Sequence, residues 1–171
     1  MTAYHEAGHA IVGKLVPEHD PVYKVSIIPR GRALGVTMYL PEQDKVSQSR
    51  RGLLSNISTL FAGRIAEELM FGEDSVTTGA SNDIKEATKC IKSMVASYGM
   101  SQYGLLDLEE LNVPATELMK EYQSISQNME ETCMRMLREN IDILETLANT
   151  LIERETMDEK PYYKQSGVVF L

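Results

Sequence analysis

The chain has 171 residues, of which 43% are hydrophobic and 25% are charged, and its formal net charge at pH 7 is −8. This length suits a single domain with its own core, and the composition is that of an ordinary soluble globule. The acidic balance argues against nucleic-acid binding, which needs Lys and Arg to neutralise phosphates. Cys90 and Cys133 lack CxxC spacing, so a disulfide framework or a thiolate zinc site is not indicated.

No apolar run is long enough to span a bilayer, and the N-terminus lacks the pattern of a signal peptide. We therefore expect no direct membrane insertion of this chain. A reduced, cytoplasmic compartment fits its cysteine usage, and any contact with a membrane would come through a partner.

The first half of the chain reads as a helix, a hairpin and a second, longer helix. Residues 3–16 carry apolar side chains at helical spacing, with Thr2 as a candidate N-cap. Residues 22–29 and 33–40 are β-branched and aliphatic runs on either side of a Pro-Arg-Gly-Arg turn, which predicts a β-hairpin. Residues 46–71 predict a central buried helix that ends at Gly72.

The second half is predicted to be helical as well. A loop over 73–81 is followed by a helix to about Tyr98, with Ser81 or Asn82 as its cap and Asp83 in its first turn. After an irregular stretch, residues 116–140 and 141–155 predict an antiparallel helical pair. The predicted fold class is mainly α, with a small antiparallel β-hairpin next to the first helix and a C-terminal helical pair.

The segment HEAGH at residues 5–9 is the strongest chemical signal in the sequence. His5 and His9 stand four residues apart on a helix, so both imidazoles project from one face and can bind the same zinc ion. Glu6 lies beside the ion, where its carboxylate can take a proton from an activated water and pass it to the leaving amine. Gly8 lets another backbone or a substrate approach this helix closely.

A catalytic zinc site needs a third protein ligand and one open position. His19 lies in a polar turn, where we expect a solvated side chain, and the cysteines are unsuitable. A carboxylate is therefore expected. From the residues alone the candidates are Glu67 or Glu68 in the long helix and Asp83 at a helix N-terminus, where the helix dipole favours an ionised side chain.

Six segments follow one another along the chain: HEAGH at 5–9, VSIIPRG at 25–31, LG at 34–35, AGRIAEE at 62–68, TTGASND at 77–83 and YGMS at 98–101. In this order they resemble the C-terminal peptidase domain of the FtsH family of AAA-linked zinc metalloproteases. The resemblance covers residues 2 to about 101 well.

The resemblance implies that Zn²⁺ is held by His5, His9 and Asp83, that Glu6 is catalytic, and that Glu67 supports a ligating histidine. It also implies that an exposed strand edge pairs with an extended polypeptide substrate. Such pairing recognises the substrate through its backbone rather than through its side chains. The positions concerned are Leu34, Gly35, Val36, Thr37 and Met38. A hexameric homo-oligomeric ring and a partner AAA ATPase, at the cytoplasmic face of the inner membrane, are further implications.

The chain also departs from the family pattern. It starts just ahead of HEAGH and contains no GxxxxGK[ST] phosphate loop, so we expect no ATPase activity of its own. Residues 1–160 are interpreted as the zinc metallopeptidase domain and 161–171 as a divergent tail. The main hypothesis is a zinc endopeptidase acting on unfolded or membrane-associated proteins. The alternatives are a truncated, weakly active or inactive ring-assembly module and a helical scaffold with an accidental HExxH.

Overall fold

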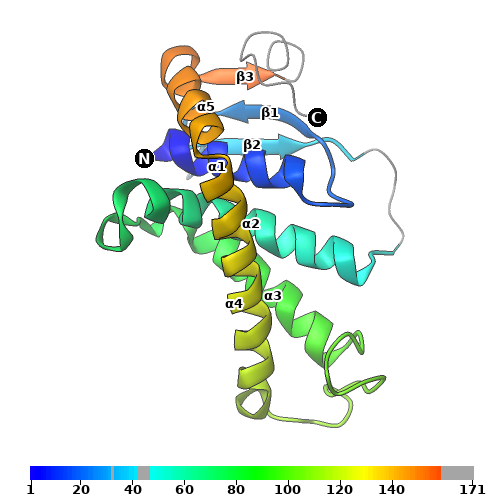
Figure 1. Cartoon of the computed structure of the whole chain (residues 1–171). Coiled ribbons are helices and arrows are strands. Elements are labelled where there is room, and N and C mark those ends of the chain that lie inside the picture. The colour runs from blue at the N-terminus through cyan, green and yellow to red at the C-terminus, as the bar shows by residue number, and fades with distance from the viewer. Residues whose placement is uncertain (32, 42–46, 159–171) are drawn as a thin grey trace.

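The computed structural model describes residues 1–31, 33–41 and 47–158, and within them helices dominate (Figure 1). In chain order the helices and strands are α1 (Thr2–Leu15), β1 (Val22–Ser26), β2 (Val36–Tyr39), α2 (Arg50–Phe71), the 3₁₀ turns η1 (Glu73–Ser75) and η2 (Thr78–Ala80), α3 (Ser81–Ala96), α4 (Ala115–Glu139), α5 (Ile141–Arg154) and β3 (Thr156–Asp158). A mainly α fold with a small antiparallel sheet is thereby confirmed.

The helix α1 lies at the centre of the molecule and contacts α2, α4, α5 and the sheet. Ten of its fourteen residues are buried. The closest crossing is with α2 at Gly8, where an added Cβ would lie 2.5 Å from the backbone oxygen of Ala62 and 2.7 Å from the Cβ of Ala66. The predicted close approach of a backbone at Gly8 is therefore confirmed, and the helix bearing HEAGH packs closely against α2.

The sheet has the strand order β2-β1-β3, and both pairings are antiparallel. The predicted hairpin is β1 with β2, although both strands are shorter than expected and Arg32 lies outside the described residues. β3 was not predicted, because three residues carry no recognisable period; its buried Met157 pairs with Val25 of β1. Within the described part of the chain, β2 is left as an edge strand.

The long helix α2 begins later than predicted and ends where predicted. Ser49 caps it by accepting a hydrogen bond from the Gly52 amide, whereas Val46 lies outside the described residues. Gly72 ends it with a φ of 83°, a conformation that glycine adopts without strain. Thr2, Ser81 and Asn82 were expected as caps, but all three lie inside their helices, and neither α1 nor α3 has a side-chain cap.

The two C-terminal helices are present but do not form an antiparallel pair. Asn140 alone links α4 to α5, and Figure 1 shows α5 continuing from the end of α4. The two helices have little contact with each other and pack mainly on other elements, α4 against α2 and α5 against α1. No helix in the described residues is both long and apolar enough to cross a membrane.

Candidate metal centre

Two helices that are distant in the sequence bring three candidate ligands together. α1 supplies His5 and His9, each 8% exposed, and the first turn of α3 supplies Asp83. The Nε2 atoms of the two histidines are 3.1 Å apart, and Asp83 Oδ2 lies 3.5 Å from the first and 3.7 Å from the second. Among the described residues, these three side chains form the group that could hold a metal ion.

The spacing of these three atoms can be compared with the size of a zinc site. Nitrogen and oxygen ligands at about 2.0–2.1 Å from a tetrahedral zinc ion lie about 3.3–3.4 Å from one another. The observed separations of 3.1, 3.5 and 3.7 Å fall around that value. The donor set of two imidazoles and one carboxylate therefore fits zinc with little rearrangement.

The hydrogen bonds of the histidines fix their tautomers. His9 Nδ1 lies 2.7 Å from the carbonyl oxygen of Thr59, and His5 Nδ1 lies 2.9 Å from Glu67 Oε1. Both oxygens only accept, so each Nδ1 carries its proton and donates. In the neutral rings the Nε2 lone pairs then face each other across 3.1 Å, an arrangement that a cation between them stabilises.

The electrostatics of the site also favour positive charge. Burial opposes protonation of His5, but hydrogen bonds to Asp83 and Glu67 and the negative charge of Glu6 outweigh it, so the pKa of His5 lies above its ordinary value of 6.5. Burial likewise opposes ionisation of Asp83, yet its interactions with the two imidazoles in their protonated forms hold the pKa of that carboxyl well below its usual range. The site therefore favours positive charge between the histidines and Asp83, and a bound divalent cation would supply that charge.

One stripe of α2 lines the histidine pair. Thr59, Gly63 and Glu67 follow one another at intervals of four, so they share a face of the helix. The first and last hold the two imidazoles, as described above, and Gly63 leaves the space between them. A Cβ at Gly63 would lie 2.5 Å from His5 Nε2 and 2.6 Å from His9 Nε2.

Glu67 also ties α2 to the loop that leads into α3. It is 2% exposed, and its Oε2 accepts a 2.8 Å hydrogen bond from the Thr77 amide. The Thr77 hydroxyl lies 3.1 Å from both carboxylate oxygens and caps the turn η2, which runs directly into α3. One buried carboxylate thus orients a histidine and anchors the segment that carries Asp83.

The carboxylate of Glu6 is held on the sheet side of the site. Its Oε2 accepts a 2.7 Å hydrogen bond from the hydroxyl of Thr37 on β2. Its Oε1 packs against Gly35, where an added Cβ would be only 2.7 Å away. Glu6 is 6% exposed, so the strand covers it closely.

Of the sequence-predicted site residues, His5, His9 and Asp83 come together, Glu67 contacts His5, and Thr37 and Gly35 contact Glu6. Among the candidate carboxylates, Asp83 faces the Nε2 atoms of both imidazoles, whereas Glu67 meets the Nδ1 atom of His5. His19 Nδ1 donates a 2.9 Å hydrogen bond to the backbone oxygen of Asp20, its ring lies edge-on to Tyr39, and it is not part of the group of three candidate ligands. Sequence reasoning missed the Thr59 carbonyl, which no pattern reports, and Gly63, whose place inside a buried helix was an available signal.

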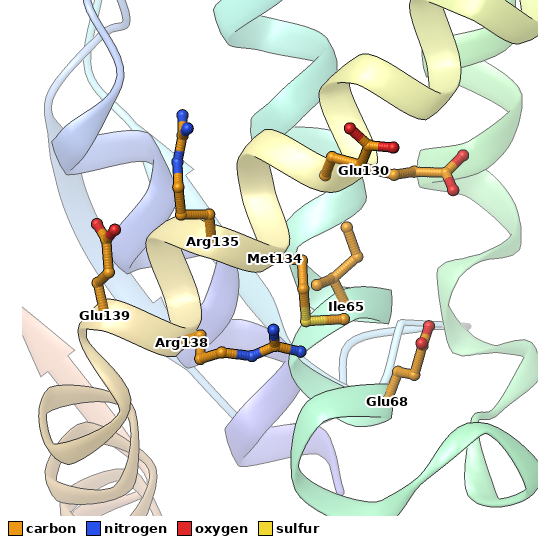
Figure 2. A pocket seen from close by; sticks show the side chains of 8 residues that line it. Ile65, Glu68, Glu130, Met134, Arg135, Arg138 and Glu139 are labelled. Carbon is orange, nitrogen blue, oxygen red and sulfur yellow. The ribbon is translucent and has the colours of Figure 1, made fainter.

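Glu68 faces a different part of the surface, in an open groove between α2 and α4 (Figure 2). Ile65 and Met134 form apolar lining, and Arg138 extends across the groove toward α2. The remaining lining residues are charged, namely Glu130, Glu131, Arg135 and Glu139. None of the three candidate metal ligands belongs to this groove, so it is separate from the centre described above.

A histidine pair one helical turn apart with a glutamate directly after the first histidine is the HExxH pattern of metallopeptidase sites, and here an aspartate from a second helix faces the pair. Residues 1–164 match the sequence profile of peptidase family M41. The chain therefore belongs to this family.

Known relatives agree with this assignment. The ATP-dependent zinc metalloprotease FtsH of Photobacterium profundum is 48% identical over 92% of this chain, which corresponds to 25% of that relative. Its namesakes in Haemophilus influenzae and Rubrobacter xylanophilus are 45% and 47% identical over 93% and 92% of the chain, and 28% and 27% of their own lengths are covered. The chain thus spans little more than a quarter of these relatives.

Proposed function

We propose that this chain is a zinc-dependent metalloendopeptidase domain, spanning residues 1–160, that hydrolyses peptide bonds in unfolded polypeptides. The observation that carries the proposal is the trio His5, His9 and Asp83, whose ligand atoms all lie within 4.8 Å of one another beside the buried Glu6. The family and the names of the relatives point to the same metal and reaction.

Each residue has one role in this proposal. His5, His9 and Asp83 hold the zinc ion, which when bound polarises the scissile carbonyl and lowers the pKa of water. Glu6 accepts the proton of the attacking water and delivers it to the leaving amine nitrogen. Glu67 does not bind the ion but keeps His5 in the tautomer that offers its Nε2 lone pair.

We also propose that substrates add a strand to β2, along Leu34, Gly35, Val36, Thr37 and Met38. Among the described strands, β2 pairs with β1 along one edge, and its other edge is open. Thr37 and Gly35 place this segment directly against Glu6. A polypeptide bound there is recognised mainly through its backbone, so the side-chain preference would be broad. The residues following 158 lie outside the described part of the chain.

The whole-protein context is a further part of the proposal. The relatives are named ATP-dependent, so folded or membrane-associated substrates would require an AAA ATPase, linked to the chain or acting in trans at the cytoplasmic face of the inner membrane. Assembly into a hexameric ring is proposed from the family resemblance, and the segment between α3 and α4 offers exposed apolar surface for contacts between subunits, with Leu105 94% and Leu111 59% exposed. Without an ATPase, we expect cleavage of unfolded chains only.

The test compares wild type with Glu6→Gln for zinc content and for cleavage of unfolded casein. We expect about one zinc per chain in both proteins and cleavage by wild type alone, because the amide keeps the size of Glu6 but cannot accept the proton. Glu68→Gln, which removes a carboxylate outside the centre, is the matched control and should cut normally. Zinc without cleavage in wild type would favour an assembly module, and absence of zinc would overturn the proposal.

A further inference from the structure

Thr37 belongs to the edge strand β2, and its hydroxyl also donates a hydrogen bond to the carboxylate of Glu6. We propose that Thr37 is a positioning residue, whose hydroxyl orients the Glu6 carboxylate toward the attacking water and couples this orientation to the strand that receives the substrate. The inference rests on the proposed function, since it assigns Glu6 as the base.

The direction of the hydrogen bond is determined by its chemistry. An ionised carboxylate can only accept, so Thr37 donates its single hydroxyl proton. Two acceptors are within reach: Glu6 Oε2 at 2.7 Å and the Glu6 backbone oxygen at 3.2 Å. The shorter contact is to the charged group, and charge-assisted hydrogen bonds are the stronger ones. The proton therefore goes to the side chain.

The other oxygen of the carboxylate has its own constraint. Oε1 lies against Gly35, two residues before Thr37 on the same strand segment, in space that a Cβ would occupy. A glutamate has several rotatable bonds and would otherwise sample many orientations. Contact with Gly35 on one oxygen and a hydrogen bond from Thr37 on the other hold the carboxylate in one of them.

The strand is itself anchored to α1. Thr37 and Tyr39 are two residues apart, so their side chains lie on the same face of β2. The Tyr39 hydroxyl donates a 3.0 Å hydrogen bond to the backbone oxygen of His9. The face toward α1 thus contacts the base and a histidine of the centre, while the outer edge of the strand remains for a substrate. A shift of β2 on substrate binding would be transmitted to Glu6 through Thr37.

The test uses Thr37→Val, which keeps the branched shape and removes the hydroxyl, and Thr37→Ser, which keeps the hydroxyl. Thr146→Val on α5, whose exposed hydroxyl donates a hydrogen bond to the backbone oxygen of Asp142, is the matched control. For all four proteins, including wild type, zinc content, kcat and KM for one internally quenched peptide and the crystal structure of the zinc-loaded chain are measured.

In Thr37→Val we expect kcat to fall about tenfold, with KM and zinc content unchanged and the Glu6 carboxylate turned away from its wild-type orientation. Thr37→Ser and Thr146→Val should match wild type within about twofold in kcat. A Thr37→Val protein with wild-type kcat, or with Glu6 unmoved, overturns the inference.

Failure of the proposed function would look different from failure of this inference. If wild type binds zinc but does not cut, the crystal structures still decide: Glu6 displaced only in Thr37→Val supports the positioning role, and Glu6 in its wild-type orientation in every variant overturns it. A loss of zinc in Thr37→Val in step with kcat would also overturn it, because the hydroxyl would then act on the metal centre as a whole.

Discussion

Gly63 determines whether the two imidazoles can point at one ion. It lies between Thr59 and Glu67 on the stripe of α2 that holds His5 and His9, and it faces the Nε2 atoms directly. Most side chains at this position would occupy the region in which the histidine lone pairs converge. The proposed centre therefore depends on the space at Gly63 as well as on its three candidate ligands.

Gly63→Ala should abolish zinc binding, because its Cβ would lie 2.5 Å from His5 Nε2. The measurement is zinc per chain by mass spectrometry after dialysis, with an expected fall from about one to nearly zero. Gly52→Ala on the same helix is the control, since its Cβ meets atoms no closer than 3.5 Å. Full zinc occupancy in Gly63→Ala would contradict the prediction.

At the scale of elements, α1 and α2 form the frame of the site. Their crossing is close because Gly8 faces Ala62 and Ala66, so α2 approaches α1 with little more than backbone between them. This proximity is what allows the carbonyl of Thr59 and the carboxylate of Glu67 to reach the rings of His9 and His5. Packing between the helices and orientation of the ligands therefore depend on the same contact.

Gly8→Ala should lower the free energy of unfolding by about 1–3 kcal/mol. Alanine gains about 1 kcal/mol of helix propensity, but the obstacle at 2.5 Å is the backbone oxygen of Ala62, which cannot rotate away. Urea denaturation measures the effect, with Gly52→Ala as a reference that we expect to be neutral or slightly stabilising. Equal stability of the two variants would mean that the helices can separate at little cost.

For the molecule as a whole, the centre joins segments far apart in the chain. His5 and His9 lie near the N-terminus, Asp83 near the middle, and the intervening α2 packs on both α1 and α3. An ion bound only by the folded arrangement stabilises that arrangement, because the unfolded chain does not hold the three ligands together.

Removal of the metal should therefore lower the Tm. A free zinc concentration of 100 times the Kd stabilises the folded state by about 2.7 kcal/mol, which corresponds to a Tm shift of roughly 5–10 °C for a chain of this size. Calorimetry with and without chelator measures this difference. The Tm of Glu6→Gln should fall with chelator as in wild type, and the Tm of His9→Ala should not change. A wild-type Tm that stays the same after complete removal of zinc would contradict the prediction.

The sequence by itself determined the local features, because they depend on neighbouring residues. Helical spacing identified α1 and α2, Gly72 identified the end of α2, and HEAGH identified a histidine pair with a carboxylate. Asp83 remained one of several carboxylates until the family resemblance selected it.

Only the tertiary structure decided what depends on contacts between distant segments. β3 forms because β1 offers it a partner. The contact of Thr37 with Glu6 spans thirty-one positions, and the contact of Glu67 with His5 spans sixty-two. No local period encodes such distances, since they follow from how the helices and the sheet pack together.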